Sequence, residues 1–110
     1  MFETKEDLQR FYEELINHFG ADVQMTIAVE EMSELQKEIC KCKRSSGDVH
    51  HIAEEIADVE IMLEQLKIMF MCESEVALLK EQKRYRTYER YLKNGKVHEQ
   101  RIGSDEISMS

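Results

Sequence analysis

One acidic pattern occurs twice in the sequence. Residues 30–35 read Glu-Glu-Met-Ser-Glu-Leu and residues 54–59 read Glu-Glu-Ile-Ala-Asp-Val, so each copy follows the order acid, acid, apolar, small, acid, apolar. Carboxylate oxygens are the ligands that hard divalent cations such as Mg²⁺ prefer in proteins. The pattern therefore predicts a magnesium site built from two pairs of carboxylates. Its candidate ligands are Glu31, Glu34, Glu55 and Asp58.

The spacing within each copy suits a helix. At about 100° per residue, two acids three positions apart lie about 60° from each other, and the apolar residues of each copy fall beside them. The acids of each copy thus border the side of the helix that packs into the core. If the two helices run antiparallel, both carboxylate pairs meet near the middle of the hairpin.

Solvated glutamates on helix surfaces are the simpler explanation, because the chain has a net charge of -8. A helix that stabilises its own surface, however, places opposite charges four residues apart. Here the pairs Glu30/Glu34, Glu34/Glu38 and Glu54/Asp58 carry like charges. Clustered carboxylates also raise one another's pKa and destabilise a fold unless a cation neutralises them. We therefore predict that the cluster binds Mg²⁺, or Mn²⁺ in its place.

The sequence predicts four helices, and the second and third carry the two acidic motifs. Apolar residues recur every three or four positions through most of the chain, and Gly20 stands where a helix end is expected. Asp48 and Ser74 are suited to begin helices, and Asn94-Gly95 to end one. The predicted helices span residues 5–19, 23–43, 48–71 and 74–93, with an antiparallel hairpin formed by the second and third.

The composition supports one all-α domain. The 110 residues include no proline, no tryptophan and only four glycines, and 35% of them are charged. Residues 1–95 form the predicted helical domain, and the polar residues 96–110 a flexible tail. The apolar side of the third helix is wider than a hairpin can cover, which predicts a homodimer or a dimer of dimers.

Charge and cysteine content restrict the partners and the compartment. The net charge of -8 argues against a nucleic-acid partner unless a cation or a local basic face intervenes. No apolar run approaches the roughly 18 residues that a membrane span needs, and the polar start does not suit a signal peptide. The three cysteines lack the spacing of a disulfide framework. A soluble cytoplasmic protein is predicted.

The two acidic motifs resemble the signature of MazG-like all-α nucleoside triphosphate pyrophosphohydrolases. Glu31-Met-Ser-Glu34 matches an ExxE motif and Glu55-Ile-Ala-Asp58 an ExxD motif, with a helix end and a short loop between them. Residues 18–71 look like the small single-domain members found in Firmicutes and their phages. The tryptophan common near the start of longer MazG-type chains is absent, and the chain is too short for their second repeated domain.

The resemblance implies an enzyme that hydrolyses a nucleoside triphosphate, NTP or dNTP, to a monophosphate and pyrophosphate in house-cleaning of the nucleotide pool. It implies that the four carboxylates hold Mg²⁺ and that the fold is a four-helix MazG-like domain completed by oligomerisation. The base that activates water is left open among Glu30, Glu38 and Glu54. Lys83 and Arg86 match a late Lys-x-x-Arg pattern and are candidate phosphate contacts. The alternative is a non-catalytic helical module for dimerisation or partner binding.

Overall fold

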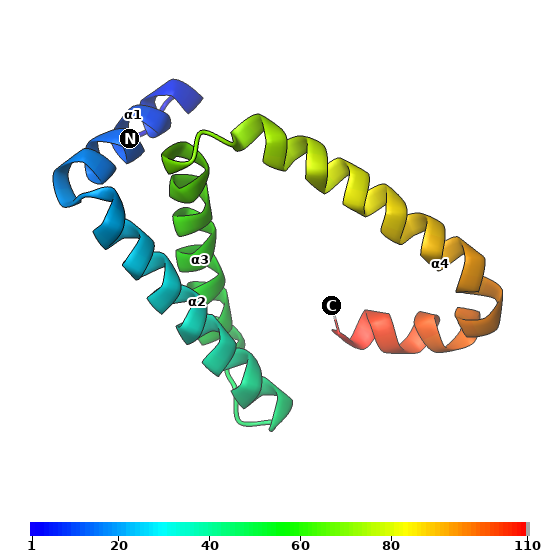
Figure 1. Cartoon of the computed structure of the whole chain (residues 1–110). Coiled ribbons are helices and arrows are strands. Elements are labelled where there is room, and N and C mark those ends of the chain that lie inside the picture. The colour runs from blue at the N-terminus through cyan, green and yellow to red at the C-terminus, as the bar shows by residue number, and fades with distance from the viewer. Residues whose placement is uncertain (110) are drawn as a thin grey trace. The chain divides into compact units, whose positions relative to one another are not determined.

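The computed structural model is all-helical (Figure 1). It describes residues 1–94 in full and, beyond them, only the course of the last helix. Its helices are α1 (Lys5–Phe19), α2 (Ala21–Lys43), α3 (Val49–Met69) and α4 (Glu73–Met109). The prediction of an all-α chain with four helices is confirmed. Residues 1–109, whose secondary structure is described, contain no strand. Helix α4 continues through Asn94-Gly95 to Met109, so the predicted end of the last helix at residue 93 is wrong. A glycine inside a helix costs only about 1 kcal/mol and need not end it. The side chains of the predicted tail, residues 96–110, lie outside the fully described residues.

The chain divides into two compact units, Met1–Glu73 and Ser74–Ser110. The first unit holds α1, α2 and α3, and the second consists of the remainder of α4. Through the described residues, no helix carries an apolar stretch long enough to cross a membrane. The acidic motifs both belong to the first unit, whereas Lys83 and Arg86 belong to the second.

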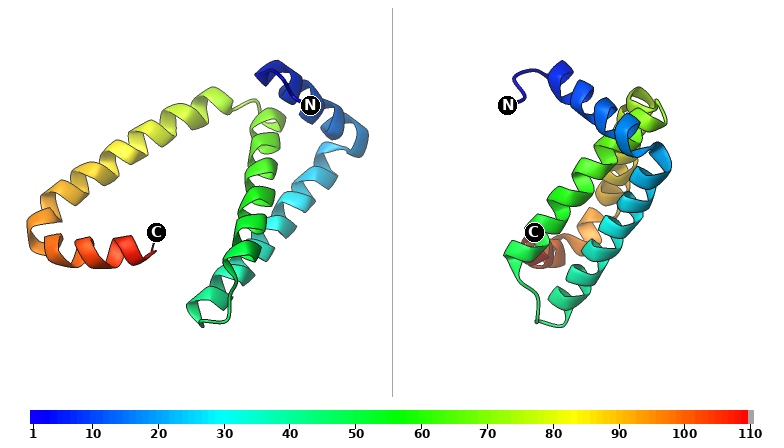
Figure 2. Two further views of the ribbon diagram at one scale, coloured as in Figure 1. Left: turned by 180° about the vertical axis from the view of Figure 1, so that it is seen from behind. Right: turned by 90° about the vertical axis from the view of Figure 1, so that its left-hand side faces the viewer.

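In the first unit, α2 and α3 lie side by side and run in opposite directions (Figure 2). Helix α1 packs against the end of this pair where α2 begins and α3 ends. The buried apolar residues are Tyr12 from α1, Ala28 from α2, and Val59 and Met62 from α3. Each helix therefore contributes one side to a small common core.

Tyr12 joins α1 to α3 through a polar contact as well as through packing. Its hydroxyl donates a hydrogen bond to Oε2 of Glu64. Burial, together with this hydrogen bond and the negative charge of Glu64, raises the pKa of Tyr12 to about 12. The raised pKa reflects how strongly the folded structure favours the protonated phenol, which donates to Glu64.

Local sequence explains where α1 begins and ends. Thr4 accepts a hydrogen bond from the backbone N–H of Asp7 at 3.0 Å, and the carboxylate of Asp7 accepts one from the N–H of Thr4 at 3.2 Å. This reciprocal arrangement satisfies two backbone groups that a helix start leaves unpaired. Gly20 follows α1 with φ 94°, a conformation that residues with a Cβ avoid. The predicted break at Gly20 is confirmed.

The end of α2 forces Ser45 into a left-handed conformation, with φ 61°. The N–H of Ser46 donates to the carbonyl of Lys41 at 2.9 Å, and the N–H of Ser45 to that of Cys42 at 3.0 Å. This pair of bonds is the Schellman helix end, whose left-handed residue is usually glycine. We expect Ser45→Gly to raise the free energy of unfolding by ~0.5–1 kcal/mol. Urea denaturation measures this gain; an unchanged or lower value would show that Ser45 is unstrained.

Gly47 approaches the last turn of α2 so closely that a larger residue does not fit. A Cβ atom at this position would lie 2.8 Å from both Cα and N of Cys42 and would also contact its Sγ. Because these backbone atoms belong to a helix, they cannot shift cheaply. We expect Gly47→Ala to lower the free energy of unfolding by about 1–3 kcal/mol. The same urea experiment tests this, with Lys43→Ala, an exposed position in the last turn of α2, as the control.

Candidate metal centre

Polar side chains from α2 and α3 meet at three levels, each seven residues from the next on both helices. At the first level, Nε2 of Gln24 donates to Oε1 of Gln65 at 2.8 Å. At the second, Glu31 faces Asp58. At the third, Oε1 of Glu38 lies 3.7 Å from Nδ1 of His51. We call these the three polar layers; they fix the register of the antiparallel pair.

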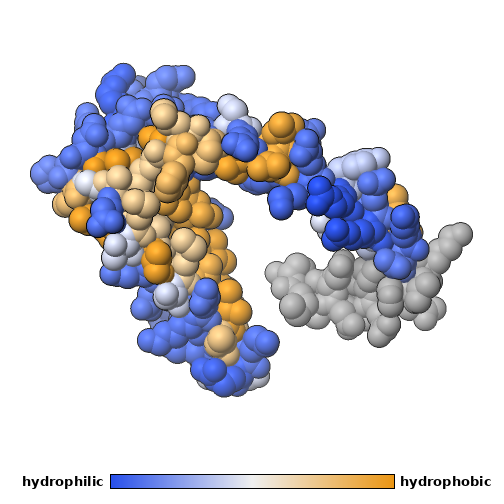
Figure 3. Space-filling model, viewed as in Figure 1, coloured by the Kyte–Doolittle hydropathy of each residue, from blue (hydrophilic) through white to orange (hydrophobic). Residues whose placement is uncertain are grey.

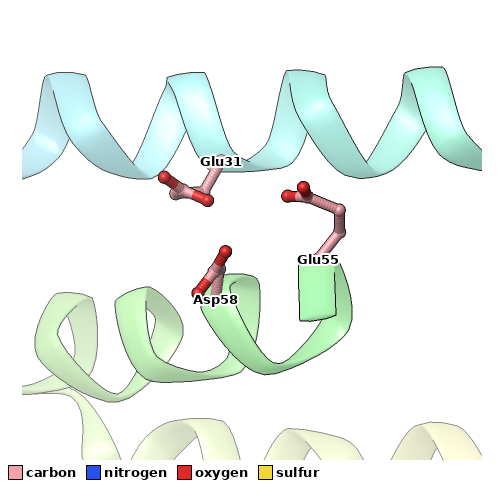
Figure 4. Close-up of side chains that lie close together, drawn as sticks. All are labelled: Glu31, Glu55 and Asp58. Atoms are coloured by element: carbon pink, nitrogen blue, oxygen red, sulfur yellow. The ribbon is translucent and has the colours of Figure 1, made fainter. Parts of the chain in front are cut away.

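The middle layer contains a cluster of three carboxylates, which we call the acidic cluster: Glu31, Glu55 and Asp58 (Figure 4). Each residue offers one carboxylate oxygen, and these oxygens all lie within 4.8 Å of one another. Glu31 comes from α2, whereas Glu55 and Asp58 stand one turn apart on α3. Three side chains from two helices thus converge on one point.

The carboxylates of this cluster disfavour one another's ionisation. Burial raises the pKa of Glu31, and so do the negative charges of Asp58, Glu55 and Glu34. Burial also raises the pKa of Glu55, followed by the charges of Asp58 and Glu34. Within the fully described residues, no lysine, arginine or histidine lies within 4.0 Å of a carboxylate oxygen of the cluster. The negative charge is therefore not neutralised by any side chain that the structure fully describes.

The donor atoms fit a hard divalent cation. Oε2 of Glu55 is buried and has no hydrogen-bond partner among the described residues. A buried carboxylate oxygen without a donor is costly, because it has lost its water and gained nothing in exchange. Three convergent carboxylates match the all-oxygen coordination of Mg²⁺, which keeps several waters and takes few protein ligands. The residues present are thus suitable to hold this ion.

The fourth predicted ligand, Glu34, stands apart from the acidic cluster. Its side chain is exposed, and the group of converging oxygens does not include it. In the antiparallel register Glu34 lies opposite Glu55, and its charge contributes to the raised pKa of both Glu31 and Glu55. Glu34 is therefore near the cluster without converging on it.

The three candidate bases differ in their surroundings. Glu30 and Glu54 are exposed, and Glu54 lies 3.2 Å from Nε2 of His50. Glu38 is buried, and its Oε2 lies 3.1 Å from Nζ of Lys41. Its charge still raises the pKa of Glu55, so it is electrostatically coupled to the acidic cluster.

The two predicted phosphate contacts, Lys83 and Arg86, are exposed on α4. They belong to the second unit, so their relation to the acidic cluster stays a prediction.

Sequence reasoning did not foresee the glutamine layer. Gln24 and Gln65 are only 4% and 2% exposed, although glutamine is usually found on the surface. Oε1 of Gln24 has no hydrogen-bond partner among the described residues. The signal was the seven-residue spacing of Gln24, Glu31 and Glu38 along one helix, which places all three on one side.

In comparisons with known proteins, no family model, curated protein or solved structure matches this chain. The resemblance to MazG-like enzymes therefore rests on the motif residues alone.

Proposed function

We propose that this chain binds Mg²⁺ at the acidic cluster and hydrolyses a nucleoside triphosphate to a monophosphate and pyrophosphate. The observation that carries the metal proposal is the convergence of three carboxylate oxygens within 4.8 Å, with no cationic partner among the side chains of residues 1–94. The buried Oε2 of Glu55, which has no hydrogen-bond partner in the part of the chain that the structure fully describes, supports it. The reaction class is supported by the resemblance of the ExxE and ExxD motifs to MazG-like pyrophosphohydrolases.

In this proposal, Glu31, Glu55 and Asp58 hold the ion, and Glu34 contributes as a further ligand or through a bound water. Bound Mg²⁺ supplies positive charge for the phosphate oxygens and Lewis-acid polarisation. Without such charge the carboxylates would repel a triphosphate. Their function is therefore to convert an acidic surface into one that accepts the substrate.

The proposed reaction breaks one phosphoanhydride bond. Water adds to the α-phosphorus, and the bond from this phosphorus to the oxygen that bridges to the β-phosphate breaks. A carboxylate among Glu30, Glu38 and Glu54 accepts the proton of the water. Lys83 and Arg86 would contact the phosphates. The leaving group is pyrophosphate, and the product is the nucleoside monophosphate.

Pyrophosphate release from a panel of NTPs and dNTPs, with and without Mg²⁺, tests the proposal. We expect metal-dependent formation of equal amounts of monophosphate and pyrophosphate. If no nucleotide is turned over and Mg²⁺ leaves thermal stability unchanged, the non-catalytic helical module becomes the better description. Mg²⁺-dependent stabilisation without turnover would retain the metal site and remove the enzymatic assignment.

We also propose that two copies associate through α3, as a homodimer or within a dimer of dimers. Ile56 and Leu63 on α3 and Phe70 directly after it recur every seven residues and are 42%, 43% and 61% exposed. Apolar side chains form a band along the visible side of the first unit (Figure 3). Such a stripe is self-complementary, as a two-fold symmetric contact requires.

Leu63→Asp should disrupt this association, because it places a charge in the centre of the stripe. We expect the wild-type chain to sediment as a dimer or tetramer at micromolar concentration and the variant mainly as a monomer. Leu78→Asp, on α4 and similarly exposed at 55% in the wild type, is the matched control. A monomeric wild-type chain would contradict the proposal.

A further inference from the structure

The middle of α4 has a charge opposite to that of the whole chain. Residues 80–93 contain six basic and two acidic side chains, so this segment carries +4 in a chain of net charge -8. All fourteen of these residues are exposed. A net negative charge repels a polyanion over the chain as a whole, but a local basic face of this size reverses the field near α4.

The basic residues are not spread evenly around the helix. Side chains of Lys80, Lys83, Arg84, Thr87, Tyr88 and Tyr91 line one shallow, open groove. At about 100° per residue these positions, together with Arg90, cover about 160° of the helix surface. Glu81 lies just beyond one edge of this arc and Glu89 well outside it. We call this arc the basic face; it contains no carboxylate.

Two exposed tyrosines stand among the cations of the basic face. Tyr88 and Tyr91 are 55% and 44% exposed, so their rings are accessible to a ligand. They are three residues apart and therefore neighbours on the helix surface. Cations that follow a phosphate backbone, combined with aromatic rings on which bases stack, are the features by which proteins bind single-stranded nucleic acid.

From this combination we propose that the basic face of α4 binds single-stranded nucleic acid. Lys80, Lys83, Arg84 and Arg90 contact phosphates, and Tyr88 and Tyr91 stack against bases. From Lys80 to Tyr91 the face is about 16 Å long, which is longer than one nucleotide unit. A single nucleotide would use only part of this length. An acidic protein segment would match the charges but would leave both rings without a stacking partner.

Fluorescence anisotropy of labelled 20-nucleotide oligo(dT) and oligo(U), with the full chain in EDTA, tests this proposal. EDTA removes divalent cations, so the measured affinity does not depend on a metal bound at the acidic cluster or on the proposed hydrolysis. We expect binding at low salt that weakens as salt rises, with a slope of log K against log salt near -3, since each neutralised phosphate of a single strand contributes about -0.7.

Two pairs of variants separate the basic face from total charge and from tyrosine content. Lys80→Gln with Arg84→Gln should weaken binding at least about 10-fold, whereas Arg10→Gln with Lys93→Gln, which removes the same charge elsewhere, should change it less than about 2-fold. Tyr88→Leu with Tyr91→Leu should also lower the affinity for the oligonucleotide at least about 10-fold, whereas Tyr85→Leu, outside the face, should change it little. Circular dichroism confirms that each variant is helical.

Several outcomes would overturn the proposal. One is the absence of oligonucleotide binding at 50 mM salt. Another is an equal loss of affinity in Lys80→Gln with Arg84→Gln and in its control, Arg10→Gln with Lys93→Gln. If heparin binds as well and the tyrosine variants bind oligonucleotides normally, the face is a general polyanion surface. If Lys80→Gln with Arg84→Gln changes the sedimenting mass but not the anisotropy, the occupant is an acidic surface of a second copy.

Discussion

Glu55→Gln and Asp58→Asn are each expected to lower kcat/KM for Mg²⁺-dependent pyrophosphate release by at least about 100-fold. Loss of even an indirect partner of a metal ligand typically costs about 10–100-fold in metal affinity or activity, and these residues would contact the ion itself. Both substitutions keep the size of the side chain and remove one negative charge. The measurement is the initial rate of pyrophosphate release, taken across a range of Mg²⁺ concentrations.

The metal dependence distinguishes a ligand from a base. A lost ligand raises the Mg²⁺ concentration needed for half-maximal rate, whereas a lost base lowers kcat at saturating Mg²⁺. Glu60→Gln is the matched control, because Glu60 is exposed on the same helix and is not part of the acidic cluster. If Asp58→Asn retains wild-type activity and metal dependence, the acidic cluster is not the active site.

Helix positions were predictable because the signals are local. The apolar periodicity gives each helix, and cap residues give several of the ends: Gly20 separates the first two helices as expected, and Asp48 accepts a hydrogen bond from the N–H of His50 at 2.8 Å. Asn94-Gly95 does not end the last helix, which continues to Met109. The last helix begins at Glu73, one residue before the expected Ser74. Such boundaries shift easily, since neighbouring residues compete for the same backbone groups.

The sequence predicts that acids of two helices come together, but it also predicts two equivalent pairs, and the structure does not have this symmetry. Counting positions on two helices treats the pairs Glu31/Glu34 and Glu55/Asp58 as equivalent. In the structure α3 contributes both of its acids and α2 only one. Helical angles give directions around one axis only; convergence also depends on the distance between the axes and on side-chain rotamers. Neither is contained in the spacing of residues along the chain.

The polar layers show a second limit of sequence reasoning. Gln24 and Gln65 are far apart in the sequence, and each is ordinary on an amphipathic helix. Their hydrogen bond exists because the antiparallel register brings these two positions together. Register depends on the whole interface, so a single buried amide pair is predictable only after the helices have been aligned. A sequence search for acids alone could not find it.

Metal-free protein is expected to become more stable when Glu31 is replaced by Gln. Folding raises the pKa of Glu31 and Glu55 above the ordinary value of 4.5, so the folded state binds protons more tightly than the unfolded chain. The stability that these groups contribute is fully present below pH 4.5 and is lost as pH rises through their folded-state values. In EDTA at pH 7, Glu31→Gln should therefore raise the thermal midpoint by a few degrees.

In the presence of Mg²⁺, the wild type should have a higher thermal midpoint than Glu31→Gln, the reverse of the order in EDTA. A ligand at 100 times its dissociation constant stabilises the folded state by about 2.7 kcal/mol, which is roughly 10 °C for a domain of this size. Wild type gains this stabilisation, whereas Glu31→Gln loses most of it because a neutral amide replaces one of the three converging carboxylates. Glu60→Gln should follow wild type in both conditions. If Glu31→Gln lowers the midpoint in EDTA, the carboxylate of Glu31 stabilises the metal-free fold, and repulsion within the acidic cluster is not what the ion relieves.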